Sequence, residues 1–150
     1  MIEIEDSVLI DRPPREVFPL ASDPRNMPLW NPAVRASEVH GPLRRGTTVI
    51  QDIDLVGRRF ETIFELRRYE PARRVTYTST AGPVRVEGTM HFRAEAGGTR
   101  VRWTVRGDCR GFLRIAERAL ILAGKRELRS CLDRLKGLLE EGPIPASIAG

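Results

Sequence analysis

The chain has 150 residues, of which 41% are hydrophobic and 30% are charged, and its formal net charge is +5. This composition is ordinary for one folded domain that can bury a sizeable core. The longest apolar run, ALILAG at 119–124, is too short to cross a bilayer, and the acidic start MIEIED is unlike a signal peptide. We therefore expect a cytoplasmic protein without a membrane span, in which Cys109 and Cys131 stay reduced.

The positive charge comes from arginine, because Lys125 and Lys136 are the only lysines among 25 basic residues. The arginines are spread along the chain and alternate with 20 acidic residues. Binding to nucleic acid uses a concentrated basic face instead. We interpret the arginines as a solvated surface and expect no nucleic-acid partner.

The first predicted element is a strand over residues 1–10, followed by two short helices. The apolar residues of the strand alternate onto one face: Ile2, Ile4, Val8 and Ile10. Asp6 interrupts this face, and nothing in the sequence explains it. The helices fall in DRPPREVFPLAS and DPRNMPLW. Pro28 and Pro32 confine Trp30 to a short broken segment, because each proline opposes a continuous helix.

Six more strands are expected before residue 110, each ended by glycine or proline. They cover 34–40, 47–55, 58–69, 73–81, 84–95 and 99–109. Gly97-Gly98 is a strong hairpin signal between the last two strands. Consecutive strands with turns every eight to twelve residues indicate an antiparallel meander.

The last predicted element is a long helix from about Phe112 to Glu141. Its apolar residues keep helical spacing, and Gly124 inside it indicates a kink or a close approach to another element. Gly142, Pro143 and Pro145 end the helix. We expect residues 1–141 to form a single domain and 142–150 to be a tail.

Alternation gives the predicted sheet one apolar and one polar face. A single helix cannot cover six or seven strands unless the sheet curls around it, and a curled sheet can leave interior space. Polar Gln51, Thr62, Tyr77 and Ser79 lie among aromatic residues on the inward faces, which favours a ligand cavity over a plain hydrophobic core. Gly88 lies in the inward row of a central strand, where a closely approaching ligand would account for a glycine.

Three stretches resemble one known family. They are IDRPPREVFPLASDP followed by W.P.V at 30–34, EGTMHFRAEAGGTRVRWTV, and RGFLRIAERAL with LDRLKGLLE. Together with the order of elements, they resemble the bacterial SRPBCC proteins of the START/Bet v 1-like superfamily, often described as polyketide cyclase/dehydrase-like, over about residues 2–141. The resemblance implies an α+β helix-grip fold, in which a curved antiparallel sheet of about seven strands wraps a long C-terminal helix. Members include ligand carriers, quinone-binding proteins and aromatase/cyclases, so the fold does not decide the activity.

We expect the cavity between the sheet and the C-terminal helix to bind a hydrophobic or aromatic small molecule that is lipid-, polyketide- or quinone-like. The residues expected to line it are Trp30, Gln51, Ile53, Thr62, Phe64, Tyr77, Ser79, Val86, Gly88, Met90, Trp103, Phe112, Ile115, Ala119 and Leu122. Trp30 is interpreted either as a lid anchor at the cavity mouth or as a residue that pins the short helices to the sheet.

The alternative function is a polyketide cyclase or aromatase-dehydratase that uses the same cavity. Such an enzyme needs an acid or a base, and Tyr77 and Arg68 are the weak candidates. No metal cluster, cofactor motif or catalytic triad is present in the sequence, and His91 is interpreted as a surface residue. A homodimer is left open.

Overall fold

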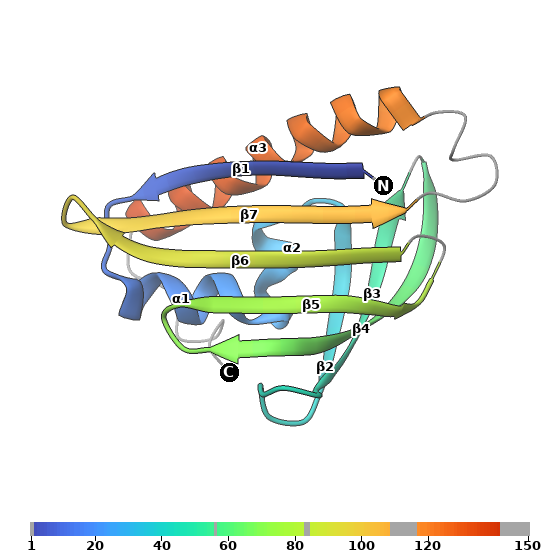
Figure 1. Ribbon diagram of the computed structural model, residues 1–150, viewed down its shortest axis with the longest axis horizontal. Helices are drawn as coiled ribbons and strands as arrows, with labels where there is room; N and C mark the ends of the chain where they lie inside the picture. Colours follow the sequence, from blue (N-terminus) through green and yellow to red (C-terminus); the bar gives the residue numbers. More distant parts are fainter. Residues whose placement is uncertain (1, 56, 83–84, 109–116, 142–150) are drawn as a thin grey trace.

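Seven strands form one antiparallel sheet in the computed structural model, which describes residues 2–55, 57–82, 85–108 and 117–141 (Figure 1). The strands are β1 Ile2–Ile10, β2 Val34–His40, β3 Thr48–Leu55, β4 Arg58–Glu70, β5 Arg74–Ala81, β6 Arg85–Glu95 and β7 Gly98–Asp108. Their order across the sheet is β1-β7-β6-β5-β4-β3-β2. The antiparallel meander predicted from the turns is therefore confirmed, and β1 closes it by pairing with β7.

The hairpin between β6 and β7 has a two-residue turn, because Glu95 pairs directly with Gly98. Ala96 and Gly97 both have positive φ, at 50° and 81°. Such a turn matches the right-handed twist of the two strands that it joins. The glycine pair thus has two separate uses. Gly97 makes the turn, and Gly98 starts β7 where its α-carbon lies against the carbonyl oxygen of Ile10 on β1.

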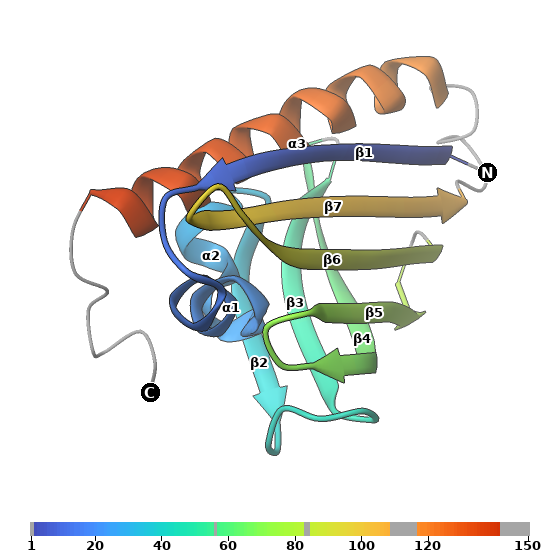
Figure 2. The same ribbon diagram turned by 60° about the vertical axis from the view of Figure 1, so that its left-hand side comes forward.

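The sheet bends strongly, so that β2 and β3 run steeply across the direction of β1, β7 and β6 (Figures 1 and 2). Register shifts in the pairing of β4 with β5, at 63–64 and at 66–68, mark bulges that help the sheet to turn. The helices lie on the concave side of this bend. The curled sheet and long C-terminal helix expected of a helix-grip fold are confirmed.

Short helical segments follow β1 and lie inside the bend. They are α1 Pro14–Ser22, the 3-10 helix η1 Pro24–Asn26 and α2 Met27–Trp30. Proline starts or interrupts each of them, which prevents one continuous helix. The Asp23 carboxylate caps η1 by accepting a hydrogen bond of 3.0 Å from the Arg25 amide.

The long helix α3, Glu117–Glu140, packs against β1. One stripe of its C-terminal half is buried, at helical spacing: Leu128, Cys131, Leu132, Leu135 and Leu139. Each fully buried leucine of this stripe contributes about 1.5–3 kcal/mol by leaving water. No helix in the described ranges is both long enough and apolar enough to cross a membrane. The expected start of this helix at Phe112 lies outside the described residues.

Asp6, which interrupts the apolar face of β1, is paired with α3. Arg129 Nη1 lies 3.2 Å from Asp6 Oδ1 and donates to the Ser7 carbonyl at 3.0 Å. The Arg129 Nη2 also reaches Asp133 Oδ1 at 2.7 Å. One guanidinium therefore joins the strand to the helix, and this pairing supplies the physical reason for an acid in that row.

Gly124 lies where α3 passes close to β1. A Cβ added there would come within 3.1 Å of Ile4 Cδ1. Of the two interpretations of this glycine, the structure supports close approach.

We expect Gly98→Ala to lower the free energy of unfolding by about 2 kcal/mol or more, because a Cβ would overlap the Ile10 carbonyl oxygen on the adjacent main chain. Gly137→Ala in α3 is the matched control, since its Cβ would meet nothing closer than the Glu141 side chain at 3.8 Å. The Gly137→Ala change should raise the free energy of unfolding by about 0.4–1 kcal/mol. Urea unfolding measures both, and a Gly98→Ala protein as stable as the parent would contradict the packing.

Cys131 should be inert in the folded protein. It is a free, buried thiol, and burial raises its pKa to about 12. Less thiolate is therefore present at neutral to mildly alkaline pH than for an ordinary cysteine. In a Cys109→Ser variant, alkylation near pH 8 should be at least about a hundredfold slower for the native chain than for the urea-unfolded one. Equal rates in the two states would refute this.

Candidate functional site

An apolar pocket lies inside the bend, between the short helices and the inward faces of β3 to β6. Its apolar lining residues are Ala21, Pro24, Met27, Val49, Phe64, Leu66, Val75 and Met90. Its polar lining residues are Ser22, Gln51 and Tyr77. None of these residues belongs to α3. The pocket thus differs in position from the expected one, since its cover is α1, η1 and α2 rather than the C-terminal helix.

Two polar side chains at this pocket do not have all of their hydrogen-bonding groups satisfied. The Ser22 hydroxyl is buried and has no hydrogen-bond partner among the described residues. Gln51 is also buried, and its Nε2 lies 3.1 Å from Met27 Sδ and 3.2 Å from Ser37 Oγ. Sulfur is a weak acceptor, so the contact with Met27 satisfies little of the donor capacity of the amide. A buried hydroxyl without a partner costs about 1–3 kcal/mol, which a ligand or a water could recover.

Tyr77 places a phenol at the wall of the pocket. Its hydroxyl oxygen accepts a hydrogen bond of 3.1 Å from Trp103 Nε1, and its ring meets Phe64 edge-on at 5.5 Å. Burial raises the pKa of this phenol far above its usual value, so the group stays protonated throughout the physiological range. No acceptor for its proton is found among the described residues, and the phenol is therefore a donor that is ready for a carbonyl oxygen.

Gly88 lies directly opposite Tyr77 in the pairing of β5 with β6. A Cβ on Gly88 would come within 2.6–2.7 Å of the Tyr77 ring and hydroxyl. The free space that we expected beside this glycine is therefore filled by the tyrosine ring. The ring, rather than a ligand, accounts for a glycine in this central strand.

Trp30 has no exposed surface and packs edge-on against Trp103, with ring centroids 5.3 Å apart at 72°. This contact joins α2 to β7, as the pinning interpretation of Trp30 expects. The Trp30 Nε1 is buried and has no partner among the described residues. A part for Trp30 in ligand binding stays a prediction.

The pocket encloses only about 20 Å³ in the described structure. This is enough for one water molecule, whereas small-molecule pockets usually measure about 300–1,000 Å³. Met27 and Met90 stand on opposite walls, one on α2 and one on β6. Methionine side chains are unbranched and adopt many shapes, so these two walls can move apart without a change in the main chain.

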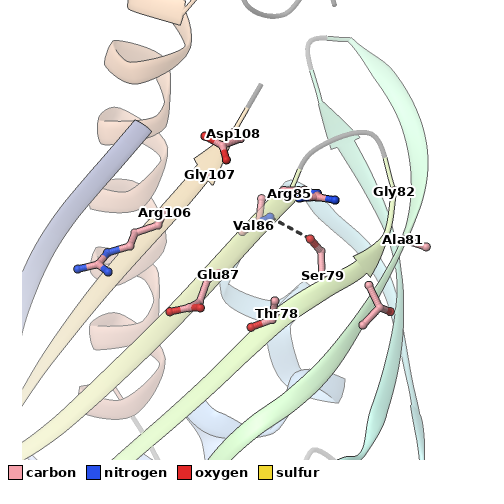
Figure 3. Close-up of a pocket in the computed structure, with 11 residues that line it drawn as sticks. Thr78, Ser79, Ala81, Gly82, Arg85, Val86, Glu87, Arg106, Gly107 and Asp108 are labelled. Atoms are coloured by element: carbon pink, nitrogen blue, oxygen red, sulfur yellow. Dashed lines mark hydrogen bonds between the residues drawn. The ribbon is translucent and has the colours of Figure 1, made fainter. Parts of the chain in front are cut away.

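A second hollow, of about 470 Å³, opens at the end of β5, β6 and β7 (Figure 3). Strands β5 and β6 stop pairing after Thr78 and Glu87, and beyond that point the Val86 amide donates to the Ser79 hydroxyl at 2.9 Å. Ser79 and Val86 therefore line this notch rather than the interior pocket. Figure 3 shows the two residues facing one another across the gap.

The other predicted site residues lie in several places. Thr62 is buried against Gly82, and Ile53 is half-buried at the edge of the core. Ala119 is exposed, and the Leu122 side chain on the same part of α3 is 54% exposed, so neither contacts the pocket. Phe112 and Ile115 lie outside the described residues.

Arg68, the second catalytic candidate, does not share the inward face. The bulge between Leu66 and Arg68 shifts the alternation, so that Arg68 pairs with Thr76 and lines a hollow on the outer face. Its side chain is 55% exposed and lies 3.6 Å from Glu70. Arg68 therefore cannot reach the interior pocket, and Tyr77 is the one catalytic candidate that lines it.

Four of the predicted residues, Gln51, Phe64, Tyr77 and Met90, line one pocket in the structure, and much of the rest of its wall was not among the predicted residues. Val49, Leu66 and Val75 share the inward alternation of those residues, and this pattern was available as a signal. The contribution of the short helices was missed because their position over the sheet is not encoded in any local pattern. No group of three or more potential metal ligands occurs in the described part of the chain.

The chain is similar to a known protein family in sequence and to solved structures in fold. Residues 1–140 match the family described as polyketide cyclase / dehydrase and lipid transport. No curated protein matches the chain in sequence. Among solved structures, the protein TTHA0849 from Thermus thermophilus is similar with a TM-score of 0.79 and 23% identity, covering 90% of this chain and 94% of its own.

Two further structures carry descriptive names. The Zhui aromatase/cyclase from Streptomyces sp. R1128 has a TM-score of 0.78 and 17% identity, covering 97% of both chains. A START superfamily protein from Mycobacterium smegmatis has a TM-score of 0.72 and 15% identity, covering 93% of this chain and 97% of its own. The resemblance found in the sequence is confirmed. Identities this low show a common fold and leave the activity open.

We expect Gly88→Ala to lower the free energy of unfolding by about 1–3 kcal/mol, because the Tyr77 ring must leave its contacts with Trp103 and Phe64. In a Tyr77→Ala background the same change should cost less than about 0.5 kcal/mol, since the obstacle is gone. Urea unfolding of the four proteins gives the coupling energy. An equal cost in both backgrounds would show that the ring does not occupy this space.

Proposed function

We propose that the chain, which belongs to the polyketide cyclase / dehydrase and lipid transport family, binds a hydrophobic or aromatic small molecule in the interior pocket. The ligand class is lipid-, polyketide- or quinone-like. The observation that carries the proposal is an apolar wall that also holds two polar groups, the Ser22 hydroxyl, which has no hydrogen-bond partner among the described residues, and the Tyr77 phenol, whose oxygen accepts from Trp103. A molecule with an apolar body and a carbonyl matches this combination.

The donor at Tyr77 is well suited to select a carbonyl. The Tyr77 oxygen accepts from Trp103, so its O–H is available to donate to a ligand. In a site that excludes water, a hydrogen bond of this kind contributes about 0.5–1.5 kcal/mol. A hydrocarbon of the same shape would leave the phenol unsatisfied, which favours the carbonyl compound.

Binding requires the pocket to enlarge. Met27 and Met90 can adopt other rotamers, and the cover above them consists of short segments broken at Pro19, Pro24 and Pro28. Such segments share few backbone hydrogen bonds, so displacing one of them does not require the others to unfold. The free energy needed to enlarge the pocket lowers the affinity for a ligand. A ligand that binds tightly must therefore fill the whole enlarged space.

The alternative, a cyclase or aromatase-dehydratase, is supported by the similarity to the Zhui aromatase/cyclase. Aldol closure needs a base that removes a proton as well as a donor that stabilises the enolate. Tyr77 can supply only the second role, because its pKa is raised. The described lining of the pocket contains no carboxylate, imidazole or amine. Binding is therefore better supported than cyclisation.

The experiment compares 2-acetylnaphthalene with 2-ethylnaphthalene, which differ by one carbonyl. The parent should bind the ketone up to about tenfold more tightly, and Tyr77→Phe should remove the difference. Ala21→Leu, which fills the pocket, should weaken both probes strongly. Ala36→Leu on an exposed position of β2 is the matched control. Calorimetry measures the affinities.

Native mass spectrometry of the purified protein tests the same proposal without a chosen probe. A retained apolar compound is expected in the parent and not in the Ala21→Leu variant. Failure of both probes to bind, together with an empty native protein, would refute the proposal. Turnover of a poly-β-keto substrate by the parent would establish the alternative instead.

A further inference from the structure

The outer face of the sheet carries a hollow of about 450 Å³ that the interior pocket does not explain. It lies near the β4–β5 turn, on the outward side of β6 and β7. Cationic or potentially cationic side chains dominate its lining: Arg73, Arg74, Arg93, Arg100, Arg102 and His91. The arginines are spread through the sequence, and the antiparallel register gathers them here.

The register sets like charges side by side. Arg74 lies directly opposite His91, which in turn lies opposite Arg102. In the next outward row, Arg93 lies opposite Arg100. Directly opposed side chains are about 4.5–5.5 Å apart at Cβ, and like charges in such positions are destabilising. The arrangement therefore has a cost in stability unless anions offset it.

Nearby carboxylates offset only part of this charge. Glu70 lies 3.1 Å from Arg74, and Glu5 lies 3.4 Å from Arg102. Glu95 is shared between Arg93 and Arg100, at 3.0 and 2.9 Å. Five guanidinium groups thus face three carboxylates, and Arg73 has no ion pair among the described residues.

The Arg74 guanidinium also has a hydrogen-bond donor without an acceptor in the described structure. Its Nη2 is bound to Glu70, while its Nε is buried and has no acceptor in the described structure. A guanidinium presents its donors in a rigid planar fork that fits the oxygens of phosphate or carboxylate. The unused donor is thus consistent with an oxyanion completing this cluster.

The protonation of His91 makes the positive charge of the hollow depend on pH. Burial and the charges of Arg102 and Arg74 lower its pKa, against the opposing effect of Glu5 and Glu70. The imidazole is therefore neutral at pH 7. A bound dianion would favour the protonated form, so the hollow gains a further positive charge when an anion occupies it.

We propose that this hollow binds a small anion that carries a phosphate group. The three carboxylates within the cluster would repel a continuous nucleic-acid backbone, whereas one compact phosphate can sit among the arginines and avoid them. The site is on the opposite face of the sheet from the interior pocket, so it does not depend on the function proposed there.

Titration of inorganic pyrophosphate into the full chain at low ionic strength tests the site. The double variant Arg73→Gln/Arg93→Gln should bind at least about tenfold more weakly than the parent. Arg58→Gln/Arg59→Gln is the matched control, because it removes the same charge from exposed positions of β4 outside the hollow. Its affinity should stay within about twofold of the parent.

An equal loss in the two double variants would overturn the proposal, because general charge attraction would then explain the binding. No measurable binding of pyrophosphate to the parent at low salt would also overturn it. Circular dichroism and urea unfolding show whether each variant remains folded. A variant that loses stability is replaced by Arg73→Gln alone, since Arg73 makes no ion pair in the described structure.

The pH dependence provides an independent readout. Sulfate is used here because its charge is constant between about pH 5.5 and pH 8, so that only the protein titrates. Affinity of the parent for sulfate should increase towards the lower pH, and His91→Gln should lose this increase. An unchanged pH profile in His91→Gln would show that the imidazole does not face the anion.

The source of the phosphate is decided by vesicles of phosphatidylcholine with and without phosphatidic acid. Binding to phosphatidic acid that the Arg73→Gln/Arg93→Gln change abolishes supports the site and identifies a lipid headgroup. Pyrophosphate binding without vesicle binding supports the site and identifies a soluble phosphate compound. Vesicle binding that survives the double variant would show that lipid attaches elsewhere and would exclude a headgroup from this hollow.

Discussion

Tyr77 packs its ring against the bare backbone of Gly88 and holds its hydroxyl 3.1 Å from Trp103 Nε1, and the shape of the interior depends on this contact. Any side chain on Gly88 would push the ring away from β6. Trp103 in turn supports Trp30, which fastens the short helices over the sheet. The same ring forms one wall of the pocket, so the packing of the interior and the proposed binding of a ligand depend on a single side chain.

Alternation along β5, β6 and β7 gives the two faces of the sheet opposite chemistry. Tyr77 and Met90 point inward to an apolar pocket, while Arg74 and His91 belong to the basic hollow on the outer face. A shift of one residue in register would exchange these faces and destroy both arrangements. The short turn at Ala96 and Gly97 therefore has a larger effect than its size indicates, because it fixes the register of β6 against β7.

The seven strands and the long helix could be predicted because their signals are local: alternation, helical spacing, and glycine or proline at the ends. Features that arise between elements could not. The bulge before Arg68 reverses the face of that residue, and Gly88 was misread because its partner Tyr77 is known only from the register. Ser22 and Met27 were missed since their place in the wall depends on how three short helices fold back onto the sheet.

The position of β1 has a consequence for how the chain reaches this structure. Its partners, β7 and α3, both come from the C-terminal half of the given sequence, so β1 stays unpaired until those two segments have been synthesised. Contacts between such distant segments slow folding and prolong the exposure of an apolar strand to other chains. Glu3 and Glu5 on its polar face, together with Asp6, place negative charge along that waiting strand and discourage its association with a second copy.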